Sequence, residues 1–165
     1  MKFWFVLLIM SAPPAAAQTK DSIAQVISNS PTQLHVQLAS TKLQIIPPKG
    51  FQLSKRFTGF EMNLETFMEV EETLNESYHQ QDIAGIKAAA VREGVTVLEH
   101  RHLKVGTRPG QYLLLQVSRD LKVYMLIFGD HEGCVKISAS FPALNSSVES
   151  AIIRSFNSMS YASTK

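Results

Sequence analysis

One short stretch of the sequence concentrates residue types that can do chemistry. Residues 129–134, written GDHEGC, bring together two acids, an imidazole and the only cysteine of the chain. A nucleophilic cysteine needs a base within about 2.6–3.2 Å and a third group that orients this base. His131 is close in sequence, but the surrounding residues match no cysteine hydrolase signature. Asp, His, Glu and Gly are instead residues that a chain reversal tolerates between two apolar strands. We therefore interpret the stretch as a turn, and Cys134 as a small buried hydrophobe.

Metal binding is the alternative chemistry for these residues. His100 and His102 are two positions apart on an expected strand, so both side chains point to the same face of the sheet. With His131 they would supply three nitrogen ligands for a divalent metal such as zinc. The first and third strands of a meander are about 10 Å apart, however, whereas zinc–nitrogen bonds are about 2.1 Å long. The sequence leaves open a metal-binding protein or a metal-dependent enzyme, with a solvated histidine pair as the simpler interpretation.

The other patterns do not predict a catalytic residue. Glu69, Glu71, Glu72 and Glu76 form an acidic stretch, but a hydrolase with paired carboxylates needs two acids that face one cleft. We interpret this stretch as a solvated face. The sequence contains no GxSxG, HExxH or glycine-rich phosphate loop. We therefore expect no cofactor and favour a protein that is not an enzyme.

The charge pattern argues against a nucleic acid partner. The formal net charge is +2, and the basic residues are scattered singly or in pairs such as Lys55-Arg56. Proteins that bind a phosphate backbone cluster Lys and Arg on one face. We expect a protein partner instead.

The first 17 residues have the layout of a cleaved secretory signal. Lys2 precedes an apolar run at 3–10, and the small residues Ala15-Ala16-Ala17 follow two prolines. The apolar run is shorter than the roughly 20 residues that a membrane-spanning helix needs, and no later run is long enough. We expect cleavage near Ala17 and a periplasmic or secreted bacterial protein with no membrane span after cleavage.

The rest of the chain has the length of one domain. Residues 18–40 are rich in Ser, Gln and Thr, and we interpret them as a leader with marginal structure and at most a short strand at 34–38. The domain at 41–165 begins with a strand at 41–46, which Pro47-Pro48 ends because proline removes a ladder donor. One or two further strands are expected between residues 57 and 70.

Two helices are predicted from capping boxes and helical periodicity. Ser77 and Gln80 form the first capping box, ahead of an apolar pattern that continues to Gly94. Ser146 and Glu149 form the second, at the start of the C-terminal helix. The apolar stripe of this second helix has spacings of 3, 1, 3, 1 and 3 and consists of Val148, Ala151, Ile152, Ser155, Phe156 and Met159.

Between these helices, four segments rich in branched and aromatic residues predict an antiparallel meander, at 95–105, 111–118, 121–128 and 134–141. Simple hairpin pairing places the odd-numbered residues of the third strand, from Leu121 to Ile127, on the same face as Val135, Ile137, Ala139 and Phe141. Leu126 and Phe128 then join Leu113 and Leu115 on the other face, so both faces are apolar and need covers. The predicted fold class is α+β: an antiparallel sheet, made of the meander plus N-terminal strands, with helices on both faces as an αβα sandwich.

The order of these elements resembles the PsbP-like αβα sandwich family over roughly residues 41–160. The resemblance is carried by Leu43-Gln44-Ile45-Ile46-Pro47-Pro48-Lys49-Gly50-Phe51, by Gly94-Val95-Thr96-Val97, by Leu126-Ile127-Phe128-Gly129-Asp130, and by a strand that ends in Phe141-Pro142 before a closing helix. Members of this family include an extrinsic subunit of the photosynthetic oxygen-evolving complex, a nuclear-transport GTPase-binding factor and bacterial periplasmic proteins. Most of them act by binding, so the resemblance implies an adaptor or assembly module.

These observations favour an exported, non-catalytic binding or assembly module of the bacterial envelope, with an envelope protein as its partner. Two alternatives stay open. One is the metal hypothesis built on His100, His102 and His131. The other is a carrier of a small apolar ligand, which would require a cavity between the sheet and a helix.

Overall fold

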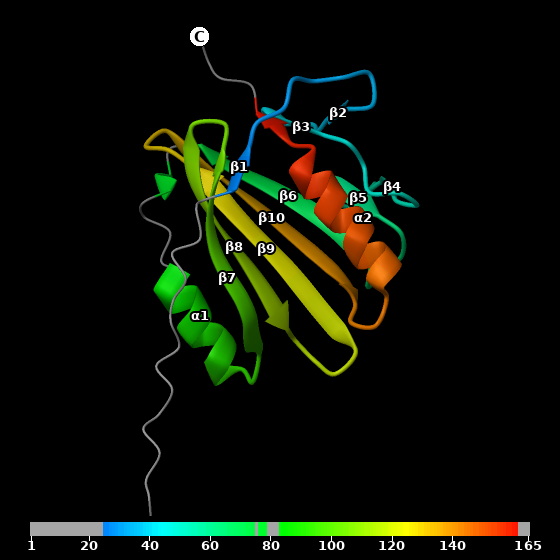
Figure 1. Ribbon diagram of the computed structural model, residues 1–165, viewed down its shortest axis with the longest axis vertical. Coiled ribbons are helices and arrows are strands. Elements are labelled where there is room, and N and C mark those ends of the chain that lie inside the picture. Colours follow the sequence, from blue (N-terminus) through cyan, green and yellow to red (C-terminus); the bar gives the residue numbers. More distant parts are fainter. Residues whose placement is uncertain (1–24, 75, 79–82, 162–165) are drawn as a thin grey trace, which may run out of the picture.

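The computed structural model describes residues 25–74, 76–78 and 83–161, so the predicted signal at 1–17 lies outside the described residues. Its largest element is one mixed sheet of eight strands in the order β1-β7-β8-β9-β10-β6-β5-β4 (Figure 1). These strands are β1 (Gln25–Ile27), β4 (Gln52–Leu53), β5 (Gly59–Glu61), β6 (Phe67–Leu74), β7 (Thr96–Val105), β8 (Arg108–Gln116), β9 (Leu121–Gly129) and β10 (Gly133–Pro142). A small sheet has the order β11-β3-β2, from β2 (Val36–Gln37), β3 (Leu43–Ile45) and β11 (Ser160–Tyr161). The helices are α1 (Ile83–Arg92) and α2 (Ser146–Asn157).

The predicted four-stranded meander is confirmed. Strands β7, β8, β9 and β10 are neighbours and run antiparallel, and β6 continues the sheet on the far side of β10. The strands expected between residues 57 and 70 are also present, as β5 and β6. Branched and aromatic side chains fill these segments and suit a pleated, half-buried surface. The meander therefore forms as its local sequence predicts.

The predicted αβα sandwich is wrong, because the protein is mostly β, with one large mixed sheet and two short helices that do not form a layer on each face. Helix α2 lies across one face, here called the first face, while α1 lies beside the β7 edge (Figure 1). On the opposite second face, Lys136 of β10 and Glu71 of β6 form a largely exposed ion pair with Nζ and Oε2 2.8 Å apart. This part of the second face is polar, and so it needs no helix to cover it.

The predicted sharing of faces between the third and fourth strands is also wrong. The observed turn leaves Asp130 to Gly133 between the paired residues Gly129 and Cys134. Because side chains alternate along a strand, a shift of one residue in the turn moves each of them to the other face. In the structure the first face combines Tyr124, Leu126 and Phe128 with Ala139, Ile137 and Val135, and the second face carries Val123, Met125 and Ile127 beside Leu115, Leu113 and Gln111.

The C-terminal helix is confirmed, and its predicted stripe is buried. Val148, Ala151, Ile152, Ser155 and Phe156 are all buried, and Met159 beyond the helix end is fully buried. The cap differs by one residue from the prediction, because the Asn145 side chain accepts a hydrogen bond from the Val148 N–H (3.2 Å). This stripe packs α2 onto the apolar residues of the first face.

The predicted start of the first helix lies partly outside the described residues. Helix α1 is described from Ile83, whereas Gln80 of the predicted capping box lies outside the described residues. Ile83 and Ile86 pack with Leu113 and Leu115, on the side of the second face formed by β7 and β8. The helix ends before Gly94, which has the positive φ of 77° that favours glycine, as the sequence predicts.

Residues 25–40, which the sequence analysis assigns to a leader, supply β1 and β2 of the structure. Strand β1 is parallel to β7, with Gln25 opposite Leu103 and Ile27 opposite Val105. The Asn29 side chain donates hydrogen bonds to the carbonyl oxygens of Asn157 (2.7 Å) and Met159 (3.1 Å). These bonds satisfy carbonyl groups at the end of α2, where helices leave such groups without a partner. The segment thereby joins the β7 edge of the large sheet to the end of α2.

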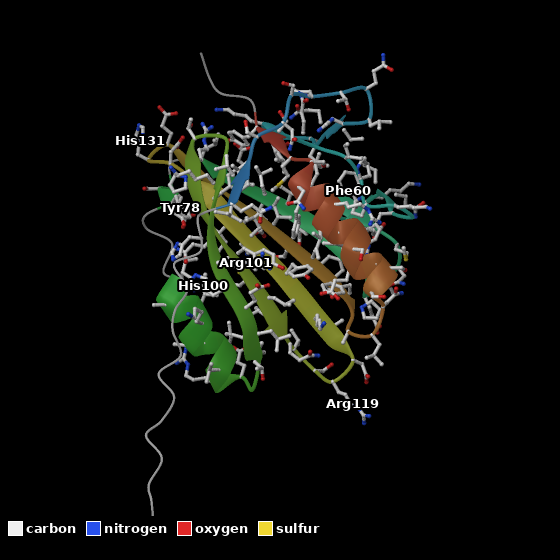
Figure 2. The ribbon with its side chains drawn as sticks, in the orientation of Figure 1. Phe60, Tyr78, His100, Arg101, Arg119 and His131 are labelled. Carbon is white, nitrogen blue, oxygen red and sulfur yellow. The ribbon has the colours of Figure 1, made fainter. Side chains whose placement is uncertain are left out.

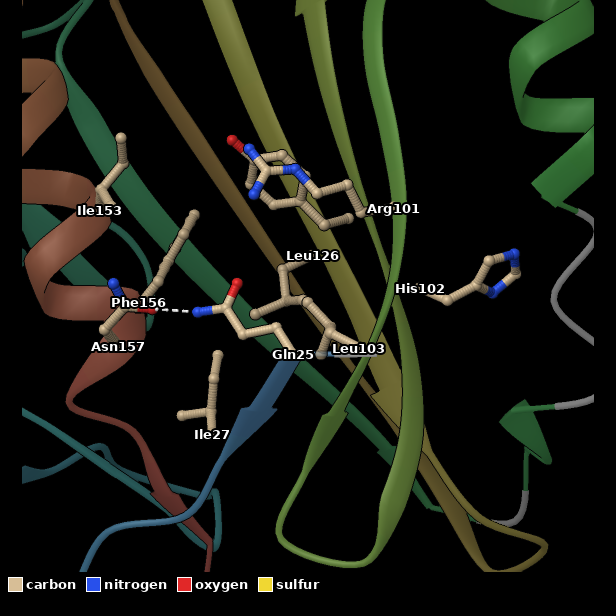
Figure 3. Close-up of a pocket in the computed structure, with 10 residues that line it drawn as sticks. Gln25, Ile27, Arg101, His102, Leu103, Leu126, Ile153, Phe156 and Asn157 are labelled. Atoms are coloured by element: carbon tan, nitrogen blue, oxygen red, sulfur yellow. Dashed lines mark hydrogen bonds between the residues drawn. The ribbon is translucent and has the colours of Figure 1, made fainter. Parts of the chain in front are cut away.

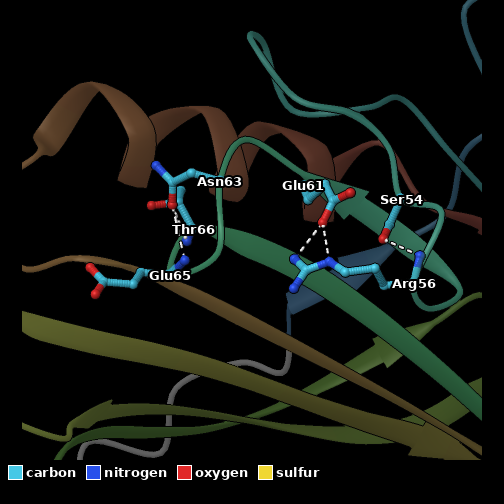
Figure 4. Close-up of polar contacts among 6 residues, drawn as sticks. All are labelled: Ser54, Arg56, Glu61, Asn63, Glu65 and Thr66. Atoms are coloured by element: carbon cyan, nitrogen blue, oxygen red, sulfur yellow. Dashed lines mark hydrogen bonds and ion pairs between the residues drawn. The ribbon is translucent and has the colours of Figure 1, made fainter.

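At the opposite edge of the large sheet, side chains fix two short loops (Figure 4). Arg56 forms an ion pair with Glu61, with its Nε–H donating to Oε2 over 2.8 Å. Asn63 Oδ1 accepts hydrogen bonds from the N–H groups of Glu65 (3.0 Å) and Thr66 (2.8 Å). This is an Asx-type turn, in which a short polar side chain replaces a backbone acceptor. The turn returns the chain from β5 into β6.

The stretch GDHEGC forms the turn that the sequence predicts. The Asp130 carboxylate accepts hydrogen bonds from the N–H groups of Glu132 (2.9 Å) and Gly133 (3.3 Å), and the Asp130 N–H donates to the Gly133 carbonyl (3.0 Å). A side chain at position 129 would place its Cβ only 2.2 Å from the Gly133 oxygen. The turn therefore requires glycine at this position for steric reasons.

We expect Gly129→Ala to destabilise the protein by about 3 kcal/mol, because the added methyl group meets backbone atoms that cannot move independently. Urea unfolding followed by circular dichroism measures this loss. The matched control is Gly94→Ala, where a Cβ would meet nothing within 4 Å and only the positive φ opposes the side chain. Gly94→Ala should lower the free energy of unfolding by about 1 kcal/mol. Equal losses in the two variants would contradict the steric explanation.

Candidate functional site

A pocket of about 210 Å³ lies on the first face between α2 and the β7 side of the sheet (Figure 3). Its floor is made by β7, β8 and β9, one wall by α2, and one end by β1. The lining residues are Gln25, Ile27, Arg101, His102, Leu103, Tyr112, Leu126, Ile153, Phe156 and Asn157. A carrier of a small apolar ligand requires a cavity between the sheet and a helix, and this pocket is such a cavity.

An aromatic cluster supports the floor of the pocket. The ring centroid of Tyr124 lies 5.1 Å from that of Tyr112, 5.0 Å from that of Phe141 and 6.0 Å from that of Phe156. The Tyr124 hydroxyl donates a hydrogen bond of 2.7 Å to Glu149 of α2, which satisfies the one polar atom of this buried ring. Contacts at these distances hold the rings in fixed orientations. The floor of the pocket is therefore preorganised, because the packed rings hold it in place without a ligand.

Arg101 places a positive charge at the rim of this apolar floor. Its guanidinium carbon lies 5.3 Å from the centre of the Tyr112 ring, directly across the β7–β8 pair. Its Nε–H donates to Glu99, two residues earlier on the same face, over 2.5 Å. About half of the Arg101 side chain is exposed, and in the described part of the chain Glu99 is the one side chain that accepts a hydrogen bond from it. The two terminal nitrogens of the guanidinium remain available to a ligand.

Two amides close the end of the pocket opposite Arg101 (Figure 3). The Gln25 Nε2 group donates a hydrogen bond of 2.9 Å to Asn157 Oδ1, which connects β1 to the last residue of α2. Both residues line the pocket. The site thus has a cationic end, an apolar middle and a neutral polar end.

The structure separates His131 from the other two histidines of the metal hypothesis, and Figure 2 shows His100 and His131 apart. His100 and His102 are neighbours on β7 with ring centroids 5.2 Å apart, as predicted, and His100 Nε2 lies 2.6 Å from Gln111 Oε1. His131 is at the exposed tip of the β9–β10 turn, where its ring lies 3.8 Å from Glu132. Residues 25–74, 76–78 and 83–161 contain no group of three or more His, Cys, Asp or Glu arranged to hold a metal ion. The metal site on these histidines stays a prediction of the sequence.

Cys134 is buried on the second face of the sheet, as the sequence predicts. Burial raises the pKa of its thiol to about 11, and the charge of Glu76 adds to the shift. The reactive form of cysteine is the thiolate, which is scarce at neutral pH when the pKa is raised. Cys134 therefore has the environment of a core residue.

The acidic stretch is divided by the alternation of β6. Glu69 and Glu71 are opposite Ser138 and Lys136 on the second face, whereas Glu72 points to the first face. The Glu72 carboxylate accepts hydrogen bonds from the Lys42 N–H (2.7 Å) and from the Tyr161 hydroxyl (2.5 Å). Glu72 thereby connects the small sheet to the large one. The prediction of one solvated acidic face is wrong for this residue.

A second hollow lies on the other face, at the end of the sheet where β8 turns into β9. It is lined by Leu64, Glu65, Phe67, Ser118, Asp120, Leu121, Val123, Ser138 and Ser140. Its rim includes the strongly exposed Leu64, and its lining has no basic side chain. The pocket beside α2 is the better candidate, because it combines lining residues from five elements with an arginine.

Of the residues that line the pocket, only His102 is among the site residues predicted from the sequence, and its side chain projects to the second face, away from the pocket (Figure 3). Gln25 lies in the segment interpreted as a leader, and Arg101 stands between the two histidines that attract attention. One sequence signal for the site is present on β7. The charged residues Glu99 and Arg101 share a face of this strand with the apolar Leu103. No protein-family model matches this chain, and no curated protein matches it either. No helix in the described part of the chain is long and apolar enough to cross a membrane.

We expect the stability of the protein to fall as the pH rises above about 10, the ordinary pKa of tyrosine. Burial raises the pKa of all four tyrosines, that of Tyr112 to about 12. The unfolded chain therefore loses these protons at a lower pH than the folded protein does. Stability from this source is complete below the unfolded pKa and is lost as the pH rises towards the folded values.

Urea unfolding at a series of alkaline pH values, with tyrosinate absorbance recorded in parallel, tests this expectation. The folded protein should show little tyrosinate at a pH where the urea-unfolded chain is half ionised. Tyr112→Phe should make the decline in stability shallower. Tyrosinate that appears at the same pH in both states would contradict the burial argument.

Proposed function

We propose that this protein is an exported binding module of the bacterial envelope, and that it holds its partner by the pocket between α2 and strands β7 and β8. The single observation that carries the proposal is this pocket, whose floor is apolar and fixed by packed rings and whose rim carries Arg101. Binding sites combine mostly apolar walls with a few placed polar groups in this way.

The size of the pocket supports a contact with one group of a partner. Ligand pockets usually enclose about 300–1,000 Å³, whereas this one holds about 210 Å³. A cavity of about 150 Å³ is large enough for benzene. The pocket therefore suits one large side chain or one ring.

A further line of argument favours an exported binding protein. The layout of residues 1–17 is that of a secretory signal. An envelope protein is the partner that fits this location.

We expect a photo-crosslinking amino acid at Ile153, on the pocket wall, to capture a discrete partner in the cells that export the protein. Ile153 is 38% exposed, so the replacement keeps the core intact. Adding Gln25→Trp should abolish the adduct, because an indole at this exposed position reaches over the pocket. Immunoblots of irradiated cells measure the adduct.

The matched control for this experiment is Val26→Trp. Val26 is the next residue of β1 and is exposed, but it does not line the pocket. It should leave the adduct unchanged, because neighbouring strand residues point to opposite faces. An adduct that survives Gln25→Trp, or a crosslinker at Leu53 that captures the same partner, would refute the proposed use of this pocket.

A further inference from the structure

Strand β7 places charged side chains on the face of the sheet that otherwise carries the apolar core. Glu99 and Arg101 alternate with Leu103 and Val105 on the first face, and both of the latter are buried. A charged group beside a core is costly unless it stays hydrated or has a partner. Arg101 satisfies this condition in part, since it is half exposed and donates one hydrogen bond to Glu99. Its remaining donors face a pocket that has no acidic side chain in its lining.

We propose that the pocket binds a carboxylate carried on a single aromatic or branched apolar group, with Arg101 holding the carboxylate. This inference rests on the proposed function, because it uses the same pocket and names the chemistry of its ligand. Guanidinium groups bind carboxylates through two parallel N–H donors, which also fixes the orientation of the ligand.

The apolar part of the ligand has a defined place. Leu103, Leu126 and Phe156 lie between the Arg101 end and the amide end, and Ile153 forms the exposed side of the wall (Figure 3). The volume of about 210 Å³ exceeds the cavity of about 150 Å³ that holds benzene, so one ring fits together with a short carboxylate arm. A longer or two-ring group would extend into solvent.

Arg101 is restrained before the ligand binds. It stacks on Tyr112 and is held by Glu99, so little of its side-chain entropy remains to be lost on binding. Glu99 also competes with the ligand carboxylate for the same guanidinium. Weakening this competitor should therefore strengthen binding, whereas damage to the fold should not.

The test is an NMR titration of the purified protein with 3-phenylpropionate and with its uncharged amide, followed through the methyl signals of Leu126 and Ile153. We expect the acid to shift these signals and the amide to bind tenfold to a hundredfold more weakly, as for loss of a hydrogen bond to a charged group. Arg101→Met should weaken binding of the acid by the same factor. Glu99→Gln should tighten binding of the acid several-fold and leave binding of the amide unchanged.

The matched control is Arg119→Met. Arg119 is exposed in the turn between β8 and β9, well away from Arg101 in Figure 2. It removes the same charge from the protein and should leave both titrations unchanged. An equal effect of Arg119→Met and Arg101→Met would reduce the binding to a nonspecific attraction between charges and overturn the inference.

Two sources of such a carboxylate are distinguished by peptides. The peptide acetyl-Ala-Ala-Phe with a free C-terminus is compared with its C-terminal amide. Tighter binding of the free peptide than of 3-phenylpropionate identifies the C-terminal residue of a partner chain, and weaker binding identifies a free small acid. Both results support carboxylate recognition.

Failure of this inference differs from failure of the proposed function. Equal binding of acid and amide, or no movement of the pocket methyl signals with any probe, would overturn carboxylate recognition. The photo-crosslinking at Ile153 uses none of these probes. If Gln25→Trp abolishes the adduct at Ile153, the pocket is still the binding site, but for a chemical group other than a carboxylate.

Discussion

The structure depends on how one short helix covers a wide sheet. A helix with its side chains is about 10 Å across and strands lie about 4.8 Å apart, so α2 covers about two strands of the eight. The first face therefore needs other covers. The small sheet β11-β3-β2 lies by the C-terminal end of α2, and strand β1 extends the large sheet beside β7. The pocket lies where α2 and β1 meet over β7 and β8, and its size follows from the gap that these covers leave.

Polar contacts between distant segments hold these covers in place. Asn29 binds carbonyl groups at the end of α2, and Ser155 of α2 donates to the carbonyl of Ile46 over 2.5 Å. Arg108 Nε lies 2.8 Å from Asp130 Oδ2, and the guanidinium carbon of Arg108 lies 4.4 Å from the centre of the Tyr161 ring. Burial alone would raise the pKa of Asp130, but the N–H of Glu132 and the charge of Arg108 keep it below its ordinary value. This end of the sheet is a network in which the terminal segments take part.

The sequence predicts elements with strong local signals and misses those that tertiary contacts create. The meander and α2 follow from β-rich segments and from a helical stripe, so their residues specify them locally. Strand β1 has only three residues and forms because β7 offers it an edge, which no local pattern of a polar segment reveals. The assignment of faces failed because it depends on the residue count of one turn. The pocket combines Gln25 with Asn157, and only the fold brings such distant residues together.

The alternation of β7 gives one strand two different chemical roles. His100 and His102 project to the second face, where His100 meets Gln111, while Glu99 and Arg101 project to the first face beside the pocket. In the sequence these four residues form one polar run, and the histidines stand out because of their known affinity for metals. The positions of these residues in the fold point instead to Arg101. A solvated histidine pair costs the fold little, whereas a charge beside an apolar core must be offset by a partner. Placing Arg101 beside the core therefore costs more free energy than leaving the histidine pair in solvent. A role in ligand binding explains why Arg101 has this position.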